Sequence, residues 1–119
     1  MSGEVKHTSQ VIYITVGEGK KAYLKYSVEN GVMKLLETYT PPEFRGRGIA
    51  AKLLDHAIML AEENGWEIEP ICSYAVHYFM KNSGKRHILT QRYRSLSDDE
   101  WRRLFEEALS RERERSGED

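Results

Sequence analysis

A basic glycine turn at residues 45–50, Arg-Gly-Arg-Gly-Ile-Ala, has the residue types and spacing of a ligand site. Gly46 and Gly48 allow a tight bend and a close approach of the backbone to a ligand. Apolar residues at helical spacing follow the turn, and the first amides of a helix have no internal partner. Such amides favour a phosphate group, and Arg45 and Arg47 add charged donors beside them. The turn therefore predicts an anion site.

Two further side chains have useful chemistry: Cys72 ends a short extended run at residues 66–72, and Tyr78 lies in the helix expected after it. An isolated cysteine among apolar residues is usually a small buried hydrophobe, but at a helix start the dipole would lower its pKa. Ligands of an open parallel sheet gather at the carboxyl ends of its strands. The turn, Cys72 and Tyr78 are therefore expected to meet at one edge. A ligand with a pyrophosphate and a long arm, such as coenzyme A, suits this layout, and another phosphorylated ligand suits the spacing equally.

A small α/β fold is expected to position these groups. Three β-rich runs joined by tight turns predict an antiparallel meander, and an Asn-Gly pair marks the second turn. Apolar residues at helical spacing then predict a helix that stops at Asn64-Gly65. A right-handed crossover would place the next strand parallel to the third. The three runs cover residues 11–16, 21–28 and 32–39.

The C-terminal part of the chain predicts one more amphipathic helix. Ser73 is expected to cap the helix that carries Tyr78, whereas residues 85–96 fit a strand, a loop or both. Ser-Asp-Asp-Glu at residues 97–100 is a capping box, and an apolar stripe follows it. The stripe either covers the sheet or forms a homodimer. Residues beyond Ser110 are entirely polar, which predicts frayed and solvated last turns.

Length and composition predict a single domain over residues 1–119, with residues 85–119 as a C-terminal extension. The formal net charge of -1, from 18 basic and 19 acidic residues, gives no overall field that would attract nucleic acid or membrane. One cysteine forms no intramolecular disulfide framework, and no apolar run reaches the roughly 20 residues of a membrane span. No signal-peptide pattern opens the chain. A cytoplasmic location is therefore expected.

The turn also resembles the signature of the GNAT acetyltransferases, in which Gln or Arg is followed by two residues, Gly, one residue, and Gly or Ala. The order of Pro41, the Arg-Gly-Arg-Gly turn, Pro70-Ile71-Cys72 and Tyr78 resembles a small GNAT-like subgroup with a Pro-x-Cys strand. The resemblance covers about residues 11–83. It implies a compact minimal GNAT-like fold, to which this chain adds a C-terminal helix.

This resemblance implies acetyl-CoA binding and transfer of the acetyl group to an unidentified amine on a small molecule or a protein. The amides of Arg47, Gly48, Ile49 and Ala50 would bind the pyrophosphate, and the strand near Tyr39 and Thr40 would pair with the pantetheine arm. Transfer would occur by direct attack or through Cys72 as a nucleophile. Tyr78 would either protonate the leaving thiolate or serve as a packing residue.

The sequence does not identify the general base, because this chain has Tyr39 at the position where many GNAT-like relatives carry a glutamate. Glu37 is the first candidate because it shares a strand face with Tyr39, and Glu43 and His77 are the others. A water relay or an already neutral amine would replace a base altogether.

Two rival functions and one further role for a basic segment are also compatible with the sequence. One rival is a non-catalytic acyl-CoA-binding module, and the other is a nucleic-acid-binding protein that uses the basic residues 85–94. That segment would otherwise contact the 3′-phosphate of the coenzyme. His7 and His56 form no metal-ligand pattern with the single cysteine, so no metal site is expected.

Overall fold

The structure is a computed structural model that describes residues 4–115, and its centre is a five-stranded mixed sheet. The strands lie in the order of the chain, with antiparallel pairs from β1 to β4 and a parallel pair between β4 and β5. The predicted α/β fold with a meander and a crossover strand is confirmed. The strands are β1 (Lys6–His7), β2 (Val11–Gly17), β3 (Lys20–Glu29), β4 (Val32–Tyr39) and β5 (Glu67–Pro70).

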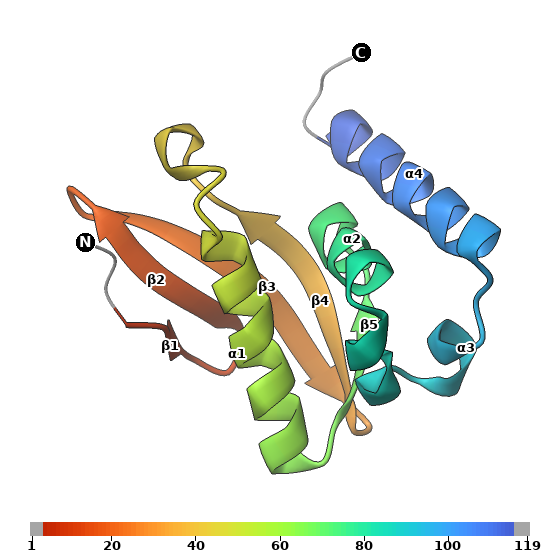
Figure 1. Cartoon of the computed structure of the whole chain (residues 1–119). Helices are drawn as coiled ribbons and strands as arrows, with labels where there is room; N and C mark the ends of the chain where they lie inside the picture. Colours follow the sequence, from red (N-terminus) through yellow and green to blue (C-terminus); the bar gives the residue numbers. More distant parts are fainter. Residues whose placement is uncertain (1–3, 116–119) are drawn as a thin grey trace.

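Two helices, α1 and α2, lie on the same face of the sheet, and α4 lies beside α2 (Figure 1). The expected stop of α1 is confirmed, since Gly65 follows its last residue with a left-handed φ of 72°. The helical segments are η1 (Pro42–Phe44), α1 (Ile49–Asn64), α2 (Ser73–Lys81), η2 (Ser83–Ile88), α3 (Gln91–Arg94) and α4 (Asp98–Arg115). Among the described residues, no helix is long and apolar enough to cross a membrane.

The core lies between the sheet and its two covering helices. Burial alternates along the central strands, as it must when one face of a sheet packs on helices and the other faces solvent. The sheet contributes Ile12, Ile14, Leu24, Met33, Leu35 and Ile68, all at most 1% exposed, and α1 contributes Leu53, Leu54 and Ala57. This packing fixes the start of α1 and the start of α2 above the sheet.

The parallel pair of strands stops short of the end of β4. Pairing ends at Leu35 opposite Pro70, and the amides of Ile71 and Cys72 both donate to the Leu35 carbonyl at 3.0 Å. β4 continues for four more residues, 36–39. On the side of β4 that faces β5, no strand in the described part of the chain pairs with these residues. Backbone groups in this gap are free to bind a ligand. The gap lies beside the start of α2.

The C-terminal region corrects one prediction and confirms another. Residues 85–96, for which the sequence favoured a strand, a loop or both, are largely helical instead, in η2 and α3, and Leu89 makes an isolated β-bridge with Ile68. The capping box is confirmed, because the Ser97 amide donates to Glu100 at 2.8 Å and the Glu100 amide donates to the Ser97 hydroxyl at 3.2 Å.

The apolar stripe of α4 packs on α2 within the same chain, with Trp101 and Ala108 buried. The fraying expected beyond Ser110 is wrong for residues 111–115, which are helical. The last residues of that prediction, 116–119, lie outside the described residues. α4 thus carries its C-terminal end to the neighbourhood of β4 and α2.

Candidate active site

The basic turn between η1 and α1 has the backbone that an anion site requires. Gly46 and Gly48 have φ angles of +79° and +76°, in a backbone region that residues other than glycine rarely adopt. Gly48 is the N-cap residue of α1, and no side chain of the described residues caps this helix. The first amides of α1, at Ile49 and Ala50, are therefore available to a ligand.

A cavity of about 400 Å³, here named the turn cavity, opens at this helix start. It is lined by the turn, by the end of β4 and by Tyr74 of α2. The coenzyme-binding residues expected from the sequence all line it except Arg47, whereas the expected catalytic residues Cys72, Tyr78 and Glu37 do not. The complete lining is Thr38, Tyr39, Thr40, Phe44, Arg45, Gly46, Gly48, Ile49, Ala50 and Tyr74.

The two arginines of the turn differ in their placement. Arg45 donates from Nε to the Thr40 carbonyl at 2.8 Å, which holds the guanidinium at the cavity wall. The guanidinium of Arg47 lies over the Phe44 ring, 5.3 Å from its centroid. Arg47 therefore contributes its backbone to the turn rather than its side chain to the cavity wall.

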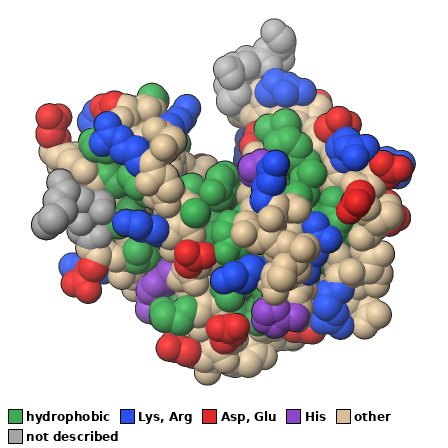
Figure 2. Space-filling view, in the orientation of Figure 1, with side chains coloured by type: hydrophobic (Ala, Val, Ile, Leu, Met, Phe, Trp, Pro, Cys, Tyr) green, Lys and Arg blue, Asp and Glu red, His purple; other side chains and the backbone are tan. Residues whose placement is uncertain are grey.

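A second cavity of about 330 Å³, here named the Cys72 cavity, lies at the gap between β4 and β5. Both cavities share Thr38 and Tyr74 in their linings, so they meet there. Figure 2 shows a notch at the top of the molecule, between the turn after β4 and the end of α4. The lining of the Cys72 cavity is Glu37, Thr38, Cys72, Ser73, Tyr74, Glu112 and Arg115.

Cys72 lines the Cys72 cavity beside Thr38, but its thiol is not activated. The side chain is buried, and Thr38 Oγ1 lies 3.2 Å from Cys72 Sγ. Burial raises the pKa of the Cys72 thiol, and the negative charge of Glu112 raises it further. The predicted lowering of this pKa by the helix dipole is therefore wrong, because desolvation outweighs it. At neutral pH the thiol is protonated.

Comparison with known proteins identifies the family of this arrangement. A family model for GCN5-related N-acetyltransferases matches residues 11–88, which include the turn, both strand ends and Cys72. The chain belongs to the GCN5-related N-acetyltransferase family. It is therefore an acetyltransferase.

A solved structure agrees with this assignment. The NMR solution structure of a GCN5-like protein from Staphylococcus aureus is similar, with a TM-score of 0.60 and 28% sequence identity. The similarity covers 72% of this chain and 86% of that chain. Among curated proteins, no sequence matches.

In this acetyltransferase the tyrosine that lines the cavities is Tyr74, not Tyr78. The Tyr78 side chain is buried, and its hydroxyl donates to Asp55 Oδ1 at 2.7 Å. Burial and the Asp55 carboxylate raise the pKa of Tyr78. Tyr74 precedes Tyr78 by four residues and thus lies on the same side of α2, a spacing that could have indicated it. Burial, followed by the charge of Asp55, raises the pKa of Tyr74 as well.

Of the three candidate bases, only Glu37 lines the acetyltransferase's Cys72 cavity. It accepts a hydrogen bond from the Tyr23 hydroxyl at 3.2 Å and pairs with Lys25 Nζ at 3.8 Å. Glu43 forms an ion pair with Lys20 on the surface. The ring of His77 packs between Tyr74 and Phe105, with centroid distances of 6.2 and 5.7 Å. These last two candidates lie outside both cavities.

The C-terminal helix adds two residues that the sequence did not indicate, Glu112 and Arg115. Glu112 accepts a hydrogen bond from the Ser73 amide at 2.8 Å and another from the Ser73 hydroxyl at 2.7 Å. The neighbouring Arg111 donates to the Ile71 carbonyl at 3.0 Å. Ser73 was expected to cap α2, but Cys72 is the N-cap residue and Ser73 binds α4 instead. Both added residues lie beyond the range that the family model matches.

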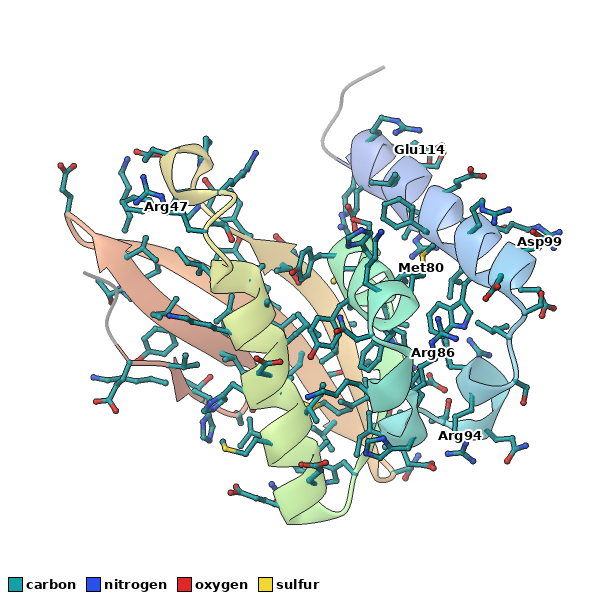
Figure 3. The ribbon with its side chains drawn as sticks, viewed as in Figure 1. Arg47, Met80, Arg86, Arg94, Asp99 and Glu114 are labelled. Carbon is teal, nitrogen blue, oxygen red and sulfur yellow. The ribbon has the colours of Figure 1, made fainter. Side chains whose placement is uncertain are left out.

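The basic segment at residues 85–94 serves the fold and does not line either cavity. Arg86 donates to the carbonyls of Phe79 and Met80, at 2.7 and 3.2 Å, and its guanidinium stacks on Trp101. Arg94 donates to the Leu89 carbonyl at 2.6 Å. Figure 3 shows Arg86 and Arg94 well apart from Arg47 of the turn. The expected contact with a coenzyme phosphate therefore has no geometric support.

Proposed function

We propose that this acetyltransferase binds acetyl-CoA in the turn cavity and transfers its acetyl group to an amine that enters through the Cys72 cavity. The observation that carries the proposal is the meeting of the two cavities at Thr38 and Tyr74. One cavity offers free helix amides to a phosphate, and the other is open to a second substrate. The acceptor is an amine on a small molecule or a protein.

The chain's own groups fit the coenzyme at both ends. The amides of Ile49 and Ala50, together with the α1 dipole, suit the pyrophosphate. On the side of β4 that faces β5, residues 36–39 have no strand partner among the described residues, so the backbone groups on that side suit the amides of a pantetheine arm. When bound, acetyl-CoA supplies the thioester near Thr38.

Direct attack by the amine is the reaction that these groups support. The amine nitrogen bonds to the thioester carbonyl carbon, and the carbon–sulfur bond breaks. Glu37 accepts the proton that the amine loses, directly or through water, and Tyr74 donates a proton to the departing sulfur. The products are the N-acetylated amine and free coenzyme A. The Tyr78 hydroxyl is bound to Asp55 and takes no part in the proton transfers of this proposal.

The architecture supports the small subgroup with the Pro-x-Cys strand. Pro70 ends β5, and Cys72 stands at the gap between the strands. Residues 1–119 form one domain in this proposal, with residues 85–119 as the extension that brings Glu112 to the site.

The experiment that tests the function has two parts. Isothermal titration with acetyl-CoA and free CoA measures binding, and release of free thiol in the presence of amines measures transfer. Measurable affinity for both ligands and amine-dependent thiol release are expected. If neither acetyl-CoA nor free CoA binds, the proposal is wrong, because both ligands carry the phosphates on which binding in the turn cavity depends.

Replacing Cys72 by alanine is expected to lower the transfer rate less than about tenfold, because a protonated, buried thiol is a poor nucleophile. Mass spectrometry of the wild-type enzyme with acetyl-CoA alone should show no acetylated Cys72. Cys72→Ser is the matched control, since it keeps a hydrogen-bonding group beside Thr38. An acetylated Cys72 that an amine then deacetylates, with a Cys72→Ala variant that has no activity, would show covalent transfer instead.

The Tyr74→Phe substitution is expected to lower kcat by about 10²-fold, the usual contribution of a general acid. The Tyr78→Phe substitution should instead lower the free energy of unfolding by about 1 kcal/mol, the value of one hydrogen bond, with a smaller loss of kcat. The comparison is matched, because each change removes one hydroxyl from the same helix. Rates corrected for the folded fraction decide it. A larger loss of kcat in Tyr78→Phe than in Tyr74→Phe would return the acid role to Tyr78.

A further inference from the structure

The wall of the Cys72 cavity opposite β4 comes from the last turns of α4. Glu112 and Arg115 line the cavity on this side, and Glu37 lines it from β4. Two carboxylates therefore face the space that an acceptor amine would enter, with one guanidinium at the end of the helix. The two residues from α4 lie outside the matched family region.

Glu112 is held in place rather than free on the surface. The side chain is half-buried, and each of its carboxylate oxygens accepts one hydrogen bond from Ser73. Ser73 is the first residue of α2, where the helix dipole favours a negative charge. The carboxylate is therefore fixed at the start of α2, one residue away from Cys72.

The charge of Glu112 acts at the reacting end of the cavity. Burial is the main cause of the raised pKa of the Cys72 thiol, and the nearby negative charge of Glu112 adds to it. The same field that disfavours a thiolate favours a cation. Glu37 adds a second carboxylate, although Lys25 partly compensates it. Arg115 has the opposite sign and lies at the outer end of the same wall.

We propose that Glu112 is a specificity-determining residue that makes the acceptor cavity prefer an amine with a second positive charge. The inference rests on the proposed function, because it assigns the acceptor of that same site. The reacting amine lies near Thr38 and loses its proton to Glu37, while the second ammonium group lies beside the carboxylate of Glu112. A volume of about 330 Å³ suits a small aliphatic diamine.

A matched pair of acceptors tests this preference. 1,4-Diaminobutane and 4-amino-1-butanol have the same four-carbon chain and differ only at one end, where the diamine carries a second charged amine and the amino alcohol a neutral hydroxyl. Because the diamine has two equivalent amines, its kcat/KM is divided by two before the comparison. The ratio of their kcat/KM values measures the preference directly. The wild-type enzyme should favour the diamine by about tenfold or more, the discrimination expected of one charged hydrogen-bonded contact.

Two variants test the role of Glu112, one that removes its negative charge and one that removes the positive charge of Arg115. Glu112→Gln keeps the shape of the side chain and an oxygen that accepts from Ser73, and it should reduce the preference about tenfold. Arg115→Gln removes the positive charge from the same wall and should raise the preference for the diamine. A merely structural role would lower the kcat/KM of both acceptors alike in Glu112→Gln and leave the ratio constant. Thermal melting of each variant accounts for any loss of folded protein.

Failure of this inference differs from failure of the proposed function. An unchanged ratio in Glu112→Gln, a lower ratio in Arg115→Gln, or a wild-type enzyme that acetylates neither acceptor would overturn the inference. Acetyl-CoA affinity, measured by titration on the same preparations, is independent of these outcomes. If Glu112→Gln does not fold, the direction of the change in Arg115→Gln decides.

Discussion

Replacing Gly48 by glutamate is expected to abolish acetyl-CoA binding, with an affinity loss of at least about 100-fold from two combined causes. The backbone at Gly48 has a φ of +76°, which strains any other residue. A Cβ at this position would meet no atom within 4 Å, so the new side chain points into open space at the turn cavity. Its carboxylate would then occupy the place offered to the pyrophosphate and repel it. Isothermal titration with acetyl-CoA and free CoA measures the effect.

Gly31→Glu is the matched control for the backbone strain. Gly31 has a φ of +77°, and a Cβ there also meets no atom within 4 Å. It lies in the turn between β3 and β4, at the end of the sheet away from α1's first residue (Figure 1). A similar loss of melting temperature with intact acetyl-CoA affinity is expected for this variant. If the control loses affinity as well, or Gly48→Glu keeps it, the turn does not bind the coenzyme.

The part of the site that the sequence predicted is local in the chain. Gly46, Gly48 and the start of α1 lie within a few residues, and their backbone conformations follow from glycine and from helix-end geometry. The same holds for the β3–β4 turn, where Asn30 and Gly31 both adopt positive φ as an Asn-Gly pair predicts. The meander and the crossover strand also followed from short-range patterns. Local chemistry decides these features almost alone.

The part that the sequence did not predict depends on contacts between distant segments. Glu112 and Ser73 are 39 residues apart, and nothing in the polar sequence after Ser110 indicates that one carboxylate will reach the start of α2. The same polar composition suggested fraying, whereas the tertiary contact makes the segment helical. β1 has two residues, too few for a pattern.

The chemical state of Cys72 could not be predicted for a related reason. Its position at a helix start argues for a lowered pKa, and its burial argues for a raised one. Only the packing around the thiol, with its exposed fraction of 4%, shows that burial prevails. Position along the chain indicated where the site lies, but packing decides which residues in it are reactive.

The Trp101→Ala substitution is expected to lower the free energy of unfolding by about 3–5 kcal/mol, the usual cost of truncating a buried tryptophan. The Trp101 side chain is 1% exposed, and it packs against Tyr93 and under the guanidinium of Arg86. Chemical denaturation measures the loss. Trp101→Phe should cost only about 1 kcal/mol, because Trp101 Nε1 is buried with no hydrogen-bond partner among the described residues and phenylalanine removes that unsatisfied donor.

Trp101→Ala also tests whether the turn cavity and the Cys72 cavity depend on α4 to different degrees. Trp101 anchors α4 near its first turn, and α4 carries Glu112 to Ser73, whereas the turn cavity is built from β4, α1 and Tyr74. A loosened α4 should therefore reduce transfer to a diamine in the folded fraction while acetyl-CoA affinity changes little. Equal losses of affinity and transfer would contradict this separation and show that the helix supports the coenzyme cavity too. A Trp101→Phe variant as unstable as Trp101→Ala would show that the cavity left by the smaller ring outweighs removal of the unsatisfied indole donor.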